Sequence, residues 1–257
     1  MAQSYHDTSR TVLRLSGADT LDFLQNLVTN DVSRLGDGLL YAALLTPQGK
    51  YLADFFLLRD GADVLLDADA GQAPGLAQRL GMYKLRADVS IETTDIAVTC
   101  HWGEGVLPGR ADPRDEGLGT RSYGLPPSDS KVTCAHYDAL RVALAIPGAG
   151  TELLPNDSFI LEMDFERLSG VDFRKGCYVG QEVTARMKHK TELRKGLARV
   201  AVEGQADPGT AITTPEGKLV GTLHTVSGEE GLAYLRFDRA TGPMLAGDVP
   251  LKRISEL

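Results

Sequence analysis

The chain has 257 residues, of which 42% are hydrophobic and 24% are charged, and these are ordinary values for a folded globular protein. The composition excludes a disordered chain, a collagen and a coiled coil, and the length favours two compact units. The longest apolar run, residues 39–45, is far shorter than the roughly 20 residues that cross a bilayer. The start of the chain lacks an apolar segment behind basic residues, so we expect neither a secretory signal nor a membrane partner.

Three cysteines, Cys100, Cys134 and Cys177, are odd in number and far apart, which is not the pattern of a disulfide framework. We therefore expect a cytoplasmic protein in a reducing compartment. The formal charge is −8, but residues 174–199 hold eight basic and two acidic side chains. This segment either forms an ordinary solvated helix face or attracts an anionic partner.

The first hundred residues read as strands and helices in the order of a ferredoxin-like unit with one extra strand. Asp19 is expected to cap a helix that ends near Asn30. The predicted strands are 11–15, 39–45, 51–58, 62–66 and 89–91, and a second helix is predicted at 76–85.

Residues 103–130 are dense in glycine and proline and are predicted to be a connection. A helix is predicted at 137–146, and a helix or helix–loop region at 157–167. After residue 192 the short runs 197–202, 218–225 and 231–237 are rich in β-forming residues and are separated by turns. This pattern predicts a small C-terminal β-barrel.

The chain lacks the glycine-rich phosphate loops and the zinc, CxxC and GxSxG motifs, so the corresponding chemistries have no support. The unusual motif is the run KGCYVGQE, residues 175–182. Cys177 follows two cations and precedes a predicted helix that starts near Gly180, and both features favour a thiolate. The alternative is an inert core cysteine, which is how we interpret Cys100 and Cys134.

KGCYVGQE resembles the KGCYxGQE signature of the YgfZ family, folate-binding proteins of iron–sulfur cluster assembly that are related to the glycine-cleavage T protein, an aminomethyltransferase. The segments LSGADTLDFLQNLVTNDVSRL, LLTPQGKYLADFFLL, ADPRDEGLGTR and QEVTARMKHKTELRKGLARV are also similar to this family. The resemblance implies an α+β fold with two intertwined ferredoxin-like subdomains and a C-terminal β-barrel around a central folate-binding hole. The implied domains are 1–192, with halves of about 1–102 and 131–192, and the barrel 193–257.

The resemblance also implies the site. Cys177 and Asp54 are the candidate catalytic residues, although Asp54 is equally well read as a strand-edge carboxylate. The candidate folate-binding residues match family motifs: Lys175, Gly176, Tyr178, Gly180, Gln181, Glu182, Arg186 and Asn30. Asn30 is also a natural helix cap, and Glu182 a natural first-turn residue. No metal ligands are assigned.

The leading hypothesis from the resemblance is a tetrahydrofolate-binding accessory protein for assembly or repair of iron–sulfur clusters, rather than a classical enzyme. It would make transient cluster contact and support cluster-dependent client proteins, including tRNA-modifying enzymes. One alternative is a folate-dependent one-carbon (aminomethyl) transferase, but the sequence has Ala143 where T proteins carry a pterin-binding glutamate. Another is a tRNA-binding module that uses the basic segment 174–199.

Overall fold

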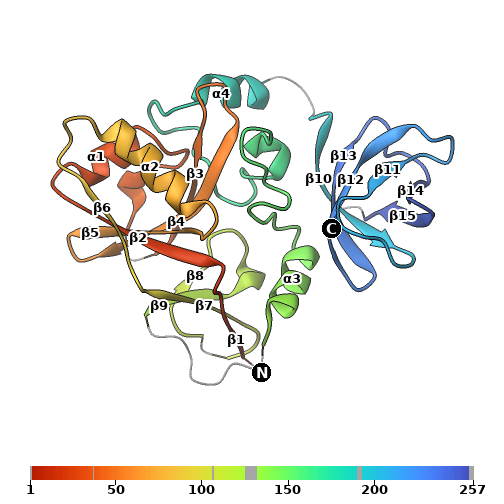
Figure 1. The fold of residues 1–257 in the computed structure, drawn as a ribbon, viewed down its shortest axis with the longest axis horizontal. Coiled ribbons are helices and arrows are strands. Elements are labelled where there is room, and N and C mark those ends of the chain that lie inside the picture. The colour runs from red at the N-terminus through yellow and green to blue at the C-terminus, as the bar shows by residue number, and fades with distance from the viewer. Residues whose placement is uncertain (1, 37, 106, 125–131, 190–192, 255–257) are drawn as a thin grey trace.

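The computed structural model describes residues 2–254, apart from 37, 106, 125–131 and 190–192. A larger α/β body lies at the left of Figure 1 and a smaller β-barrel at the right. In the described residues no helix is long and apolar enough to cross a membrane.

The first sheet of the body has the strand order β3-β4-β5-β2-β6, and every neighbouring pair is antiparallel. Its strands are β2 (Arg10–Ser16), β3 (Leu40–Leu45), β4 (Tyr51–Asp60), β5 (Asp63–Asp69) and β6 (Ser90–Thr93). Helices α1 (Thr20–Gln25) and α2 (Ala73–Lys84) and the 3₁₀ turn η1 (Val32–Arg34) complete the unit. The chain order is the predicted ferredoxin-like order, with β3 as the extra strand at the edge of the sheet.

The second sheet has the order β1-β7-β9-β8. Its strands are β1 (Gln3–His6), β7 (Ala97–Trp102), β8 (Arg110–Ala111) and β9 (Thr120–Gly124), and it is followed by helix α3 (Cys134–Ala143). Because β1 precedes the whole first sheet in the sequence and pairs with β7, the two halves of the body are intertwined. A prediction fails in detail here: residues 110–124 of the expected connection form β8, the turn η2 (Glu116–Leu118) and β9, while 125–130 lie outside the described residues.

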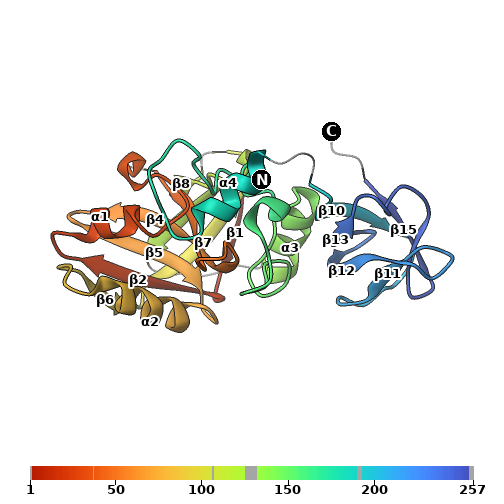
Figure 2. The same cartoon turned by 90° about the horizontal axis from the view of Figure 1, so that it is seen from above.

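The turn η3 (Ile160–Met163) and helix α4 (Gln181–His189) lead out of the body into the barrel. The six barrel strands close in the order β10-β13-β12-β11-β14-β15. They are β10 (Lys195–Val202), β11 (Ala211–Thr213), β12 (Leu219–Ser227), β13 (Glu230–Arg236), β14 (Met244–Ala246) and β15 (Val249–Arg253). Seen from above in Figure 2, α3 lies between the first sheet and the barrel.

Alternation along the strands builds two cores from one sheet. On β3, Ala42 and Leu44 face α1 and α2, whereas Tyr41, Ala43 and Leu45 belong to a second core. That second core also contains side chains of the second sheet, α3, η3 and the outer face of the barrel, including Leu197 and Leu232. The barrel is therefore packed on the body by shared apolar burial, which anchors the segments around the candidate sites.

One local expectation differs from the structure. The Asp19 side chain does not cap α1; it accepts a hydrogen bond from the backbone N–H of Asp88 at 2.8 Å. A contact with a distant segment thus replaces the local cap that the sequence pattern favours. The segment 157–167 takes the helix–loop form of its prediction, with the 3₁₀ turn η3 as its helical part.

Candidate functional site

The signature loop is anchored by a buried lysine. Lys175 is 7% exposed, and its Nζ donates to the backbone oxygens of Gln25 (2.7 Å), Val28 (2.6 Å) and Asn30 (3.0 Å). These three acceptors use all three protons of the ammonium group, and burial lowers the pKa of Lys175 to about 8. Lys175 therefore fixes the loop to the segment after α1, and its ammonium group has no donor left for a ligand.

Gly180 locks the other end of the loop. It has φ = +84°, and a Cβ at this position would lie 2.6 Å from the Thr46 carbonyl oxygen and 3.1 Å from the Gly49 Cα. Gly49 has φ = +75°, and a Cβ at this position would lie 2.8 Å from the Val183 Cβ of α4. The β3–β4 hairpin and the start of α4 thus approach at a distance that only glycine permits, so Gly180 has a packing role, while its ligand contact remains a prediction.

Between these anchors, Cys177 is a free, exposed cysteine. Gly176 is also exposed, and a side chain there would meet nothing within 4 Å. Tyr178, in contrast, is buried beneath the loop, with the Lys175 Nζ 5.2 Å from its ring centroid. The remaining predicted residues of the segment lie on α4, where Gln181 is half-buried and Glu182 and Arg186 are exposed.

Asp54 lies elsewhere, in the middle of β4, and is 3% exposed. Its Oδ2 accepts a hydrogen bond from the Tyr41 hydroxyl (2.9 Å), and its Oδ1 accepts one from the Tyr51 hydroxyl (2.6 Å). Burial, together with the Asp54 carboxylate, raises the pKa of both tyrosines well above the ordinary value, so both hydroxyls remain donors. Asp54 is therefore a buried carboxylate fixed by two hydrogen bonds, and its reading as a strand-edge carboxylate is wrong.

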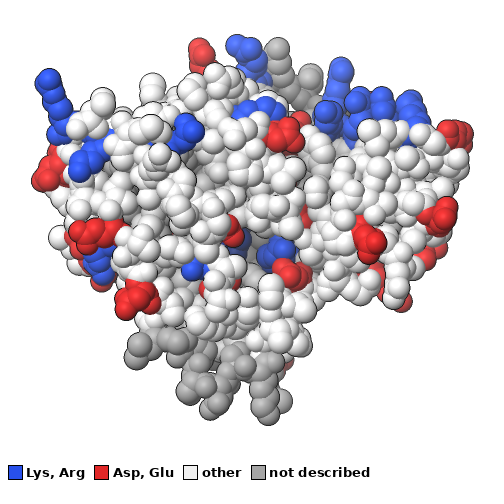
Figure 3. All heavy atoms as spheres, in the orientation of Figure 1, with Lys and Arg blue, Asp and Glu red and all other residues white. Residues whose placement is uncertain are grey.

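Asp54 lines a cavity of about 120 Å³ at the meeting of the two sheets and α3. A hollow with basic and acidic atoms inside it is visible near the centre of the molecule in Figure 3. Its charged lining residues are Asp7, Arg10, Asp54, Asp69, Arg114, Arg121, Asp138 and Arg141. Cys177 is not among the lining residues, so the expectation of one site containing Asp54 and Cys177 is wrong for this cavity.

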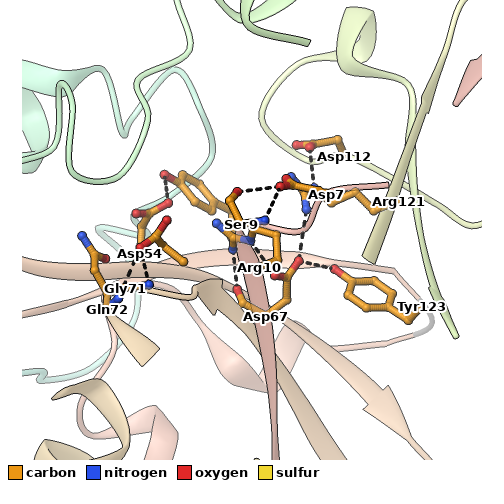
Figure 4. Close-up of polar contacts among 12 residues, drawn as sticks. Asp7, Ser9, Arg10, Asp54, Asp67, Gly71, Gln72, Asp112, Arg121 and Tyr123 are labelled. Atoms are coloured by element: carbon orange, nitrogen blue, oxygen red, sulfur yellow. Dashed lines mark hydrogen bonds and ion pairs between the residues drawn. The ribbon is translucent and has the colours of Figure 1, made fainter. Parts of the chain in front are cut away.

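The arginines of the cavity are held by buried carboxylates. Arg10 Nε donates to Asp67 at 2.7 Å, and Arg121 joins Asp67 (3.1 Å) to Asp112 (3.1 Å), as Figure 4 shows. Arg114 completes a two-point contact with Asp112. Arg114 and Arg121 lower the pKa of Asp112 to about 2, although burial of the carboxylate acts in the opposite direction.

An aromatic ring supports the same arginine network. The Phe56 ring has the guanidinium carbons of Arg10, Arg114 and Arg121 at 5.7, 4.8 and 4.3 Å from its centroid. Cations over a buried ring face are favourable where water is excluded. This part of the cavity wall is therefore an ionic layer in which Arg10, Arg114 and Arg121 are paired with Asp67 and Asp112.

Asn30, a predicted ligand, has a structural role. Its Nδ2 donates to the backbone oxygens of Tyr41 (2.8 Å) and Ser169 (2.7 Å), and its Oδ1 accepts from the Asp31 N–H (2.8 Å). The side chain thus ties three segments together inside the body. Its alternative reading as a helix cap is wrong, because α1 ends at Gln25, and its role as a ligand remains a prediction.

Sequence reasoning missed part of the cavity. Cys134 was interpreted as structural, yet it is exposed at the start of α3 and lines the cavity, where its Sγ donates to Asp138 at 3.3 Å. The DPR run at 112–114 was noted only as a resemblance, although it supplies the Asp112–Arg114 pair. Arg10 and Arg141 carried no sequence signal, because only the tertiary fold brings β2 and α3 together.

The basic segment 174–199 is divided between buried, paired and exposed side chains, and Arg174, Arg186 and Arg194 are exposed. Lys175 is buried, and Lys188 and Arg199 pair with Glu166 (2.5 Å) and Glu230 (2.8 Å). Lys190 lies outside the described residues. In the part of the chain that the structure describes, no three His, Cys, Asp or Glu side chains cluster to hold a metal ion.

Comparison with known proteins places this architecture. The model of the CAF17 C-terminal β-barrel domain matches residues 194–255. In structure, the chain is similar to the glycine cleavage system aminomethyltransferase T from Bartonella henselae, with a TM-score of 0.78 and 14% identity, covering 100% of this chain and 85% of the other. The expected T-protein-like α+β fold with a C-terminal barrel is thereby confirmed.

Sequence relatives are mitochondrial proteins. The iron–sulfur cluster assembly factor IBA57 of Mus musculus is 30% identical over 278 residues, which cover 91% of this chain and 78% of the mouse protein. The IBA57 homolog of Mycosarcoma maydis is 33% identical over 218 residues, and the match spans 73% of this chain but 54% of that relative, about half its length.

These relatives correct the expected location of the protein and specify its family. The relatives are mitochondrial, including the human protein at 29% identity, so the expected cytoplasmic location is wrong and the comparisons point to mitochondria. The YgfZ family that the signature resembles is a close relative of the family that the comparison finds. With 30% identity over most of the mouse protein, the chain belongs to the IBA57 family of iron–sulfur cluster assembly factors.

Proposed function

We propose that this protein is an accessory factor that assembles or repairs iron–sulfur clusters and that Cys177 is its functional thiol. One observation carries the proposal: Cys177 is exposed on a loop whose two ends are fixed by the buried Lys175 and by the Gly49–Gly180 contact. A thiolate is a natural iron ligand, and a rigid loop presents it without an ordering cost. The names of the relatives support cluster assembly as the process.

The test compares Cys177→Ser with Cys134→Ser, which changes the other exposed cysteine. Each full-length variant would replace the wild-type protein in cells, and the activity of a mitochondrial [4Fe–4S] enzyme would be measured. We expect Cys177→Ser to remove most of the support, whereas Asp207→Asn, on the exposed surface of the barrel, should retain it. Cys134→Ser tests the Asp54 cavity, because Cys134 lines it. Equal activity of Cys177→Ser and wild type would reject the role of the thiol.

The same proposal also concerns which client enzymes depend on this protein. The clients would be cluster-dependent enzymes, including those that modify tRNA. Activities of several such enzymes, and the level of a thiolated nucleoside in tRNA, would be measured in the Cys177→Ser background. A loss in the cluster enzymes with unchanged tRNA thiolation would remove tRNA-modifying enzymes from the client set.

We also propose that the Asp54 cavity binds tetrahydrofolate or a derivative. The Asp54 carboxylate suits one edge of a pterin, because it can accept hydrogen bonds from ring N–H groups while the Tyr41 and Tyr51 hydroxyls hold it in place. The fit in size is partial: the cavity of about 120 Å³ is below the roughly 300 Å³ at which cofactor pockets begin. Binding therefore requires the cavity to widen.

Calorimetric titration with tetrahydrofolate tests this second proposal. Wild type should bind, and Asp54→Asn should lose at least tenfold in affinity, whereas Asp207→Asn on the exposed surface of the barrel should not change it. Absence of binding at high micromolar ligand would reject folate and leave the role of Cys177 untouched. Turnover of a methylene-tetrahydrofolate would instead indicate the one-carbon transferase, which the fold resembles but whose glutamate is replaced by Ala143.

A further inference from the structure

A second cavity lies where the barrel meets the body. Its volume is about 210 Å³, and it shares no lining residue with the Asp54 cavity. The body contributes Lys50, Asp157 and Glu162, and the barrel contributes Lys195, His224 and Tyr234. We call these six residues and the space between them the junction pocket.

Some polar groups around the junction pocket are already paired. The Glu162 Oε2 accepts from the Tyr234 hydroxyl at 2.5 Å, and the Lys50 Nζ donates to the Asp157 backbone oxygen and lies 3.6 Å from the Phe159 ring centroid. Glu152 also lines this cavity, but its carboxylate is already committed: it accepts from the Thr225 hydroxyl (2.6 Å), the Thr225 N–H (3.1 Å) and the Gly148 N–H (2.8 Å), and it pairs with Arg141 (3.6 Å). These bonds join the barrel to the body and fix the walls of the pocket.

Other polar groups of the junction pocket have no hydrogen-bond partner among the described residues. They are the Lys195 ammonium, the His224 imidazole and the Asp157 carboxylate, and one oxygen of Glu162 is also uncommitted. The Asp157 carboxylate lies close enough to Tyr234 to contribute, after burial and Glu162, to the raised pKa of that hydroxyl. Burial lowers the pKa of His224, so near neutral pH the cation of the barrel wall is Lys195.

The walls of the junction pocket therefore carry free charges of opposite sign. A purely anionic ligand would be repelled by the carboxylates of Asp157 and Glu162. A purely cationic ligand would be repelled by the ammonium groups of Lys50 and Lys195. A small ligand that carries both charges satisfies both sides. We propose that the junction pocket binds a zwitterion of amino-acid size, with its carboxylate at Lys195 and its ammonium group at Asp157 and Glu162.

Such a ligand would bridge the two parts of the molecule. Lys195 begins β10 of the barrel, whereas Asp157 and Glu162 belong to the body segment around η3. A bound zwitterion adds charge-assisted hydrogen bonds to both parts, and such bonds are stronger than those between neutral groups. Binding therefore stabilises the barrel against the body and raises the melting temperature of the full chain.

The probes are glycine and L-serine, with acetate and methylamine as the two halves of the zwitterion. Ligand-detected NMR titration on the full-length protein should show saturable binding of the amino acids, and acetate and methylamine should each bind at least tenfold more weakly. Lys195→Met and Asp157→Asn should each lower the amino-acid affinity at least tenfold. Lys218→Met, at an exposed barrel lysine outside the pocket, should leave it unchanged.

Two results would overturn the proposal. One is the absence of saturable binding of either amino acid up to 50 mM, roughly the weakest range that such a titration resolves. The other is acetate binding as tightly as glycine, which would show that the pocket recognises only the carboxylate. Because Lys195 and Asp157 are not part of the Asp54 cavity or the Cys177 loop, both results are independent of the proposed function.

Discussion

Gly49 and Gly180 pack directly against each other, and a Cβ on Gly180 would lie 3.1 Å from the Gly49 Cα. One belongs to the hairpin between β3 and β4, and the other immediately precedes α4. Two sequence segments with family resemblance, LLTPQGKYLADFFLL and KGCYVGQE, therefore pack against each other. This contact determines where the loop of Cys177 lies.

Gly180→Ala should destabilise the protein by about 2 kcal/mol or more, because the new Cβ meets backbone atoms and the positive φ disfavours any side chain. Gly176→Ala is the matched control on the same loop, since its Cβ would meet nothing within 4 Å. Chemical denaturation followed by circular dichroism measures both. Equal stability of the two variants would contradict the packing role of Gly180.

Lys175→Met should destabilise the protein by roughly 2–4 kcal/mol, because three buried carbonyl oxygens lose a charged donor. The matched control is Arg174→Met, which changes the exposed cation next to it. Hydrogen exchange should also show faster opening of the segment 25–30 in Lys175→Met. An unchanged exchange rate there would show that the ammonium group does not hold this segment.

The Asp112 carboxylate should contribute to acid stability. Its pKa is about 2 in the folded protein and 3.8 as the ordinary value. Since the folded pKa is the lower one, the contribution is present above pH 4 and is lost as the pH falls toward 2. A difference of this size corresponds to about 2 kcal/mol.

Unfolding free energies of wild type and Asp112→Asn, measured between pH 5 and pH 2, test this prediction. The gap between them should narrow by about 2 kcal/mol over that range. Asp207→Asn, on the exposed surface of the barrel, should keep a constant gap to wild type. A constant gap for Asp112→Asn as well would contradict the assigned role.

Alkylation should distinguish the three cysteines. In the native protein, iodoacetamide should modify Cys177 and Cys134, which are exposed, and spare Cys100, which is 1% exposed on β7. Burial also raises the pKa of the Cys100 thiol, which lowers its reactivity further. Mass spectrometry of native and urea-unfolded protein gives the sites, and rapid native modification of Cys100 would contradict the fold around β7.

The sequence-based prediction of elements was largely correct for the first sheet and the barrel, because alternation and turn residues are local signals. The strands predicted at 51–58 and 62–66 and the start of α4 near Gly180 were found in this way. The roles of Lys175 and Asn30 could not be found, because motif matching cannot separate a ligand-facing polar group from one that bonds to a distant backbone. Cys134 was missed because its surroundings come from β1 and the cavity wall.

By itself the sequence determined the order of strands and helices in the first sheet, the C-terminal barrel and the signature loop with its cysteine, since each depends on residues that are neighbours in the chain. The second sheet was not found in this way. Only the tertiary structure decided that Asp54 and Cys177 occupy different places, and that four arginines from β2, β9, α3 and the DPR segment line one cavity. The physical reason is that burial and charge pairing depend on contacts between residues far apart in the sequence, such as Arg10 with Asp67 and Glu152 with Thr225.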